Sequence, residues 1–169
     1  MKKCFLGIIL MMAGFHITLA QNFAIYQNIK FDRPEQYKEH QQMAHEAAKY
    51  VLTTPHSNED EERMHAARFM LKWMEGTPDY NFDILPWMAG LNRTDRFLYP
   101  VTMAALVKAA LDDTQKEKDA NALQVATAEE VAKYMANKEH KLRPRSTGKK
   151  FVQAWEEGRL EEFLELPEE

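Results

Sequence analysis

The segment from Phe97 to Leu111 constrains the fold most, because it is apolar on almost every side of a helix. Lys108 is the only charged residue within it. A helix without a polar face must be covered by other elements, so it belongs at the centre of a helical bundle. We therefore predict a central helix that begins at Thr94 or Asp95 and ends near Leu111.

Other stretches also show apolar residues at helical spacing. The helices predicted from them span residues 32–53, 57–76, 114–137, 148–157 and 159–166, with a short helical turn at 84–88. The helix at 57–76 has Ser57 or Asn58 as its expected N-cap. Thr127 and Glu130 have the spacing of a capping box, which leaves open a split of the helix at 114–137.

Glycine and turn patterns complete the prediction of the fold class. Each of Gly76, Gly90, Gly148 and Gly158 stands where an apolar helical period stops, as a left-handed C-terminal cap residue would. No segment alternates apolar and polar residues, and no Asn-Gly or Asp-Gly pair suggests a hairpin. The sequence predicts an all-α chain: a single irregular bundle of about five to six helices in one domain, residues 21–169.

The first twenty residues have the pattern of an export signal. Lys2 and Lys3 precede an apolar run that extends to Phe15, and the small-residue ending Thr18-Leu19-Ala20 follows. This pattern predicts a signal peptide over residues 1–20 that is cleaved after Ala20. Because the apolar run is too short to span a bilayer, and no later run is longer, we expect a periplasmic or secreted protein that does not span the membrane.

Composition excludes several classes of function. The only cysteine, Cys4, lies in the predicted signal, so the mature chain would have no thiol for a disulfide, a zinc site or a nucleophile. The chain carries a net charge of −4, which becomes −6 once Lys2 and Lys3 are removed. An acidic domain of this size is a poor general binder of nucleic acid, so no nucleic-acid partner is predicted.

No residue pattern identifies a catalytic residue, a metal site or a cofactor. His40 and His45 are five residues apart and so do not face one metal ion as an i, i+4 pair would. Ser57 and Ser146 stand at predicted helix starts, where they would act as caps. Carboxylates are abundant, and two acids distant in sequence can form a hydrolytic pair without leaving a motif.

Two charged runs lie near the C-terminus, one acidic and one basic. The acidic run is expected to be a solvated tail: Glu156, Glu157, Glu161, Glu162, Glu165, Glu168 and Glu169. The basic run is expected to be a solvated connector, alone or paired with that tail; the alternative is a site for phosphate or an anionic glycan near the helix start at Gly148. Its residues are Lys138, Lys141, Arg143, Arg145, Lys149 and Lys150.

Aromatic residues gather in and beside the connection that follows Gly76. The candidate ligand-binding residues are Trp73, Asp79, Tyr80, Phe82 and Trp87. Rings beside carboxylates suit the binding of sugars or peptides. The alternative is that the rings fill the open end of the bundle. Trp73 in particular is expected to be a core anchor whose indole N–H reaches a backbone carbonyl.

The stretch from Ala47 to Ala110 resembles a family of small exported all-helical bacterial proteins. The motif that carries the resemblance is Lys72-Trp73-Met74-x-Gly76-Thr77-Pro78-Asp79-Tyr80. The similarity is good over the first three helices and loose over the last third of the chain. It implies export and a helical fold, but it brings no activity, ligand or catalytic residue to this sequence.

These features support two hypotheses of different classes. The first is an exported, non-enzymatic binding or interaction module for an unknown envelope or extracellular partner, which uses the aromatic segment or a groove beside the central helix. The alternative is a carboxylate-based hydrolase that acts on an envelope or dietary polysaccharide or peptide.

The first testable prediction is that the mature protein begins at Gln21, because Thr18-Leu19-Ala20 is the expected end of the signal peptide. N-terminal sequencing and intact mass of the exported protein measure this directly. Retention of residues 1–20 in the exported protein would show that this segment is not a cleaved signal.

Overall fold

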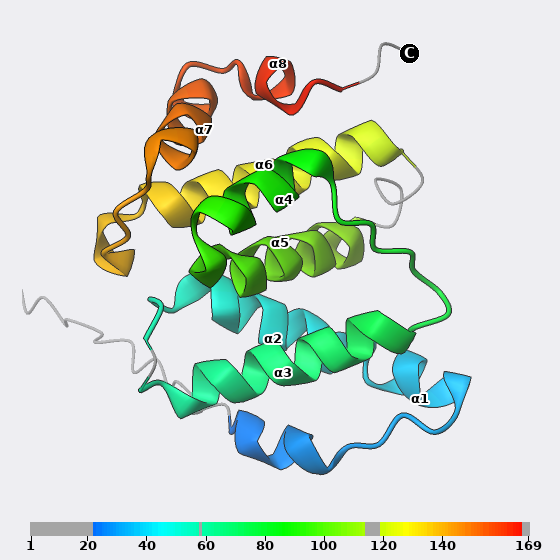
Figure 1. The fold of residues 1–169 in the computed structure, drawn as a ribbon. Coiled ribbons are helices and arrows are strands. Elements are labelled where there is room, and N and C mark those ends of the chain that lie inside the picture. The colour runs from blue at the N-terminus through cyan, green and yellow to red at the C-terminus, as the bar shows by residue number, and fades with distance from the viewer. Residues whose placement is uncertain (1–21, 58, 114–118, 167–169) are drawn as a thin grey trace, which may run out of the picture.

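The computed structural model describes residues 22–57, 59–113 and 119–166 (Figure 1). The predicted signal peptide lies outside these residues. In the described part, all regular structure is helical, which confirms the all-α class. Within the same ranges, none of the helices combines the length and apolarity needed to cross a bilayer.

The helical elements follow one another with short connections. In chain order they are η1 (Phe23–Asn28), α1 (Pro34–Glu39), α2 (Gln41–Thr53), α3 (Glu61–Gly76), α4 (Pro86–Thr94), η2 (Arg96–Leu98), α5 (Tyr99–Asp112), α6 (Ala120–Ala136), η4 (Lys138–His140), α7 (Ser146–Glu156) and α8 (Leu160–Leu164).

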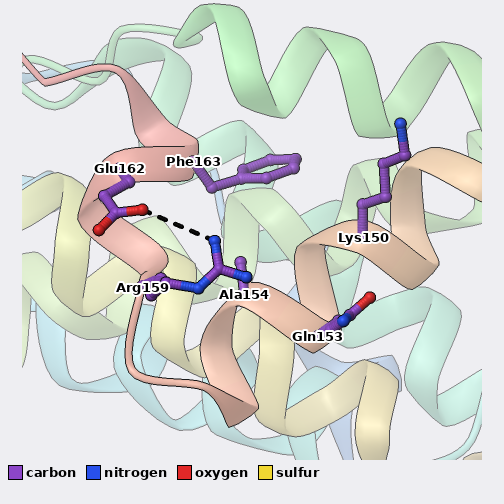
Figure 2. A pocket seen from close by; sticks show the side chains of 6 residues that line it. All are labelled: Lys150, Gln153, Ala154, Arg159, Glu162 and Phe163. Carbon is purple, nitrogen blue, oxygen red and sulfur yellow. Dashed lines mark ion pairs between the residues drawn. The ribbon is translucent and has the colours of Figure 1, made fainter.

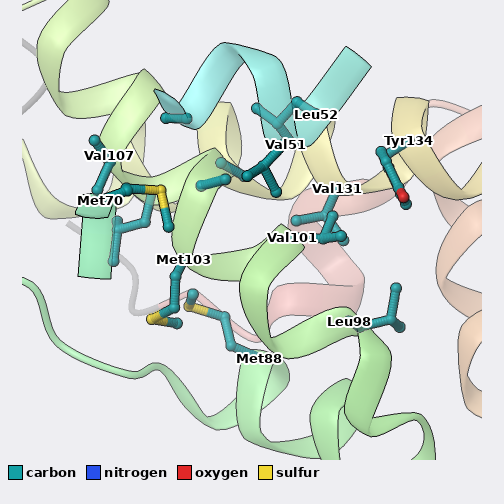
Figure 3. Close-up of a cluster of buried hydrophobic side chains, with 14 of the residues drawn as sticks. Val51, Leu52, Met70, Met88, Leu98, Val101, Met103, Val107, Val131 and Tyr134 are labelled. Atoms are coloured by element: carbon teal, nitrogen blue, oxygen red, sulfur yellow. The ribbon is translucent and has the colours of Figure 1, made fainter. Parts of the chain in front are cut away.

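The apolar helix predicted from the sequence is α5, and it lies between α2 on one side and α6 on the other (Figure 1). It begins at Tyr99 and not at Thr94 or Asp95, because Thr94 ends α4 and Asp95 caps η2 by accepting from the Phe97 N–H. Its residues from Val101 to Ala110 are buried except Lys108. The Nζ atom of Lys108 lies 2.7 Å from Asp112 and 3.5 Å from Glu130, so the one charge in this stretch is paired. Side chains of the surrounding helices close around α5 in one contiguous apolar cluster (Figure 3).

The predicted helix at 32–53 is two helices, α1 and α2, which meet at His40. The backbone of His40 has φ −102° and ψ 9°, outside the helical range. Both its backbone N–H and its ring Nδ1 lie within hydrogen-bonding distance of the Gln36 carbonyl oxygen, at 3.1 and 2.7 Å. This local side-chain contact competes with continuation of the helix, and the chain turns there.

Helix α3 begins at Glu61, later than predicted, and its N-cap is Asp60 rather than Ser57 or Asn58. The Asp60 carboxylate accepts a hydrogen bond from the Arg63 N–H at 2.8 Å. Ser57 instead accepts from the Glu59 N–H at 3.1 Å, which forms a turn before the helix. An ionised cap also interacts favourably with the positive end of the helix dipole, which favours the later start.

The helix α6 is continuous through Thr127, so the predicted alternative of a split is wrong. The Thr127 hydroxyl donates to the Leu123 carbonyl at 2.7 Å, one turn back along the helix, and is therefore not available as an N-cap. The first residues of the predicted helix, 114–118, lie outside the described residues.

The glycines have different roles from those predicted. Only Gly158 has the left-handed conformation, with φ +68° after α7. Gly90 lies within α4, and Gly148 lies within α7. A Cβ atom at Gly148 would come 2.8 Å from the Met135 methyl group, so this glycine allows α7 to approach α6 closely.

The N-terminal segment runs along α3 (Figure 1) and is fastened to it by polar contacts. The Phe23 N–H donates to the Glu62 carboxylate at 2.7 Å, and the Lys72 ammonium donates to the Ile29 carbonyl at 2.7 Å. The Phe23 side chain is fully buried. Residues expected to be a simple lead into the first helix are therefore part of the core.

Trp73 joins the end of α3 to α1. Its ring is fully buried, and its indole N–H donates to the Tyr37 backbone carbonyl at 2.7 Å. That carbonyl lies in the last turn of α1, where helix carbonyls lack intrahelical partners. The Tyr37 ring in turn covers Gly76, where an added Cβ would overlap the phenol, and it stacks on Phe31 with centroids 4.5 Å apart.

Arg63 is a buried cation that ties α3 to two other helices. Its side chain is 4 % exposed. It donates to the carbonyls of Val51 and Thr54 at the end of α2, and to the Tyr134 hydroxyl of α6, each at 3.3 Å. The Tyr134 hydroxyl donates to the same Thr54 carbonyl at 3.2 Å. A cation at this position interacts favourably with the negative end of the α2 dipole.

The two buried tryptophans provide a matched stability test. Trp73→Phe removes the hydrogen bond to Tyr37 and leaves that carbonyl unpaired, whereas the indole N–H of Trp87 has no hydrogen-bond partner among the described residues. We expect Trp73→Phe to cost about 1 to 3 kcal/mol more unfolding free energy than Trp87→Phe. Urea denaturation followed by circular dichroism measures the difference, and equal losses would contradict the anchoring role of the indole N–H.

Substitution of Arg63 tests the polar junction. Arg63→Met keeps much of the stem volume but leaves the Val51 carbonyl without its Arg63 donor and the Thr54 carbonyl with the Tyr134 hydroxyl alone, so we expect a loss of about 2 to 4 kcal/mol. Because Tyr134 shares this network, a double-mutant cycle with Tyr134→Phe should show coupling of at least about 0.5 kcal/mol. Strictly additive losses would mean that the two side chains stabilise the fold independently.

Candidate functional site

The connection between α3 and α4 places two aromatic rings side by side. Residues 77–85 have no regular structure and run from Thr77, the C-cap of α3, to Leu85, the N-cap of α4. Tyr80 and Phe82 are two residues apart, and their rings lie with centroids 5.9 Å apart and planes 15° apart. Both rings pack against the Trp73 ring, with centroid distances of 5.8 Å for Tyr80 and 6.0 Å for Phe82. The buried indole therefore supports both rings from inside the molecule.

These rings line a hollow of about 350 Å³, which we call the aromatic hollow. It lies where the end of α3, the connection and the start of α5 meet. The residues that line it are Leu71, Met74, Glu75, Thr77, Tyr80, Asn81, Phe82, Ile84, Tyr99 and Met103. Ile84 is 54 % exposed and Tyr99 is 40 % exposed, which is unusual for large apolar side chains.

The structure separates the five residues predicted to bind a ligand. Tyr80 and Phe82 line the aromatic hollow, whereas Trp73 is buried behind it and Asp79 is exposed outside it. Trp87 is 8 % exposed and stacks on Phe151 of α7, with centroids 5.5 Å apart. Two of the predicted residues therefore face this hollow, and the two tryptophans belong to the packing of the helices.

A groove beside the central helix was one predicted location of the site, but Tyr99 and Met103, which α5 contributes to the hollow, were not among the predicted residues. Tyr99 and Met103 are four residues apart and so lie on one face of this helix. The apolar pattern predicts that the whole helix is buried, but Tyr99 in its first turn is 40 % exposed. The pattern at Tyr99-Pro100 was a usable signal, because a proline at the first turn marks a helix start, where side chains are less completely covered.

The hollow offers polar groups around its apolar surface. Glu75 is the only carboxylate among the residues that line it. The Asn81 side chain donates to the Asp83 carboxylate at 3.1 Å, and Asn81 also lines a second hollow of about 210 Å³ together with Asp83 and Leu123. Asn81 is the residue that the two hollows share, and each hollow has its own single carboxylate, Glu75 or Asp83.

A further hollow, of about 340 Å³, lies between α7 and α8 (Figure 2). Its charged lining includes Lys150, Arg159 and Glu162. The Arg159 guanidinium lies 3.6 Å from Glu162 and also pairs with Glu157. Because its arginine is already neutralised by neighbours in sequence, this hollow is a weaker candidate for ligand binding than the aromatic hollow.

The histidines considered as metal or acid–base residues have separate positions. His45 lies 2.6 Å from Asp112, His65 lies 3.1 Å from Gln27, and the His140 Nδ1 lies 2.9 Å from the Tyr134 carbonyl. The described residues contain no cluster of three or more His, Cys, Asp or Glu side chains that could hold a metal ion.

His56 packs against an exposed ring near the end of α4. Its imidazole lies 4.4 Å from the Phe97 ring. Burial and the nearby Arg63 charge lower the pKa of His56, and Asp95 opposes this shift. The imidazole is therefore neutral at neutral pH and supports Phe97 as an aromatic neighbour.

Comparison of the chain with protein-family models, with curated proteins and with solved structures found no match.

Proposed function

We propose that this chain is an exported, non-enzymatic binding module of the bacterial envelope and that the aromatic hollow is its ligand site. The export part of the proposal rests on the pattern of Lys2, Lys3 and Thr18-Leu19-Ala20. The binding part rests on one observation: segments distant in sequence converge on a single hollow and leave Ile84 and Tyr99 exposed in it.

The lining favours a ligand that combines a flat apolar face with a polar edge. Tyr80, Phe82 and Tyr99 provide rings, while Glu75 and Asn81 provide an acceptor and an amide beside them. A sugar ring has this combination, and so does an aromatic or amide side chain of a peptide. The volume of about 350 Å³ is within the range of small-molecule sites.

The walls of the hollow are suited to binding without rearrangement. Tyr80 and Phe82 both rest on Trp73, whose indole is fixed by the Tyr37 carbonyl at 2.7 Å. Rings held in place in this way lose little conformational freedom when a ligand binds, which increases affinity. The buried tryptophan would thus act as the support of the site rather than as a contact.

The hydrolase alternative gains no support from the aromatic hollow. A carboxylate-based hydrolase needs two acids across the bound substrate, one as acid and one as base or nucleophile. Glu75 is the only acid that lines this hollow, and the other hollows described above also have one lining carboxylate each, Asp83 and Glu162. The geometry therefore favours binding over hydrolysis.

Substitution of Tyr99 tests the proposed site. Arrays of envelope glycans and of peptides supply candidate ligands, and calorimetry then measures their affinity for the mature chain. We expect Tyr99→Ala to weaken binding at least about tenfold, which corresponds to about 1.4 kcal/mol. Ile25→Ala is the matched control, because Ile25 is 60 % exposed and lies outside the hollow, and it should bind like the wild type.

Two outcomes would contradict the proposal. Unchanged affinity of Tyr99→Ala for every ligand found would move the site away from the hollow. Cleavage of a bound glycan or peptide by the wild type, lost in Glu75→Gln, would support the hydrolase alternative instead.

A further inference from the structure

A second concave surface, distinct from the aromatic hollow, is strongly basic. It has a volume of about 700 Å³, twice that of the aromatic hollow. We call it the basic hollow, and the residues that line it are Arg93, Thr94, Asp95, Arg96, Phe97, Lys141, Leu142, Arg143 and Arg145. The basic run seen in the sequence supplies one side of it, and the end of α4 with η2 supplies the other.

The charge of the basic hollow is opposite to that of the whole chain. Five of its lining side chains are cationic and one, Asp95, is anionic, so its formal charge is +4 in a chain of net charge −4. Fixed charges of one sign in a concave surface concentrate ligands of the other sign. Three residues of the basic run, Lys141, Arg143 and Arg145, line this hollow. They make no ion pair with any acid that the structure describes, so they are not paired with the described part of the acidic tail.

The five cations of the basic hollow have no polar partner among the described residues. Among the described residues, their charged groups form neither ion pairs nor hydrogen bonds; the nearest contact is that of the Arg96 guanidinium with the Phe97 ring, at 5.9 Å. The single carboxylate, Asp95, accepts a hydrogen bond from the Phe97 N–H at 3.1 Å and caps η2. Five cations that share one hollow with a single carboxylate repel one another, and an anionic ligand would reduce this repulsion.

The start of α7 adds to the positive potential of the basic hollow. Arg145 is the N-cap residue of this helix, which has no side-chain cap and no acidic residue in its first turn. Its unpaired N–H groups and the positive end of its dipole therefore lie beside the cations. The C-terminal end of α4 is the negative end of its helix dipole. Arg93 lies in the last turn of α4, and its positive charge offsets this negative end.

Phe97 provides an apolar surface within the basic hollow. Its side chain is 41 % exposed and rests on the neutral His56 ring, with centroids 4.4 Å apart. A ligand that satisfies both features has several negative charges and a flat apolar face between them. Guanidinium groups bind carboxylate and sulfate groups with paired hydrogen bonds, and an aromatic ring packs on the C–H face of a sugar.

We propose that the basic hollow binds an acidic oligosaccharide, with its carboxylate or sulfate groups on Arg93, Arg96 and Arg143 and one sugar ring on Phe97. Single-stranded nucleic acid is the less favoured ligand, because proteins that bind it stack successive bases on several rings. Phe97 is the only aromatic residue that lines the basic hollow. This inference does not depend on the proposed function of the aromatic hollow.

The test compares matched ligands on the mature chain by calorimetry at several salt concentrations. The ligands are a sulfated heparin tetrasaccharide, a carboxylated galacturonate tetramer, neutral maltotetraose and inorganic sulfate. We expect at least one acidic tetrasaccharide to bind at least tenfold more tightly than the neutral tetrasaccharide and inorganic sulfate. The two acidic ligands distinguish sulfate from carboxylate as the recognised group.

Three variants locate the binding. Arg96→Gln with Arg143→Gln should weaken binding of the acidic tetrasaccharide at least tenfold and lower the salt dependence by about one ion per arginine removed. Arg68→Gln with Lys38→Gln changes the net charge equally on exposed residues elsewhere and should bind like the wild type. Phe97→Ala should weaken the tetrasaccharide but not inorganic sulfate.

Lys141→Gly is a variant that removes one charge of the basic hollow without destabilising the fold, so that weaker binding cannot be caused by unfolding. Lys141 has a left-handed backbone with φ 53°, which glycine adopts freely, so this variant removes a charge without straining the chain. It should weaken acidic-tetrasaccharide binding while keeping the wild-type melting temperature. The proposal is overturned by equal weakening in the Arg68/Lys38 control, by no saturable binding of either acidic ligand, or by tighter binding of a single-stranded oligonucleotide.

Discussion

The hydrogen bonds from Arg63 to the end of α2 determine how the first half of the molecule is assembled. A single guanidinium reaches the Val51 and Thr54 carbonyls and the Tyr134 hydroxyl, and thus connects α2, α3 and α6 at one point. Burial raises the pKa of Tyr134, and the Arg63 charge partly offsets this, so the phenol stays protonated as a donor. With α2 and α6 held in this way, α5 is enclosed between them.

The fold class was predictable because it depends on the average pattern of apolar residues. The stretch around Val101 to Ala110 has no polar face, and this pattern alone places α5 inside. Helix ends were less predictable because each depends on a competition between a few local contacts. Asp60 rather than Ser57 caps α3, and the contact of His40 with the Gln36 carbonyl divides the first helix. Gly148 lies inside α7 because close packing on Met135 requires it, which no local pattern shows.

The candidate site was predictable only where its residues are neighbours in sequence. Tyr80 and Phe82 lie together because an extended segment places alternate residues on one side. The indole donor of Trp73 was expected to find a backbone carbonyl, but its acceptor, Tyr37, comes from a helix far away in sequence. The same limit applies to the basic hollow, since Arg93 and Arg96 join Lys141 and Arg143 only through tertiary packing, in which α4 lies against α7. Residues distant in sequence come together in this way through tertiary contacts, and no local pattern in a single sequence predicts such contacts.

The close contact of Tyr37 with Gly76 has a consequence for the order in which the chain can fold during synthesis. Residues 23–39 leave the ribosome before α3, so the surfaces that receive them, around Glu62, Lys72 and Gly76, are made later. The isolated N-terminal segment is too short to form a stable helix by itself. The segment therefore stays unfolded, with Phe23 and Phe31 exposed to solvent, until α3 has left the ribosome. A chain held unfolded for transport across a membrane would meet this condition without difficulty, because both parts would then become available on the far side within one folding event.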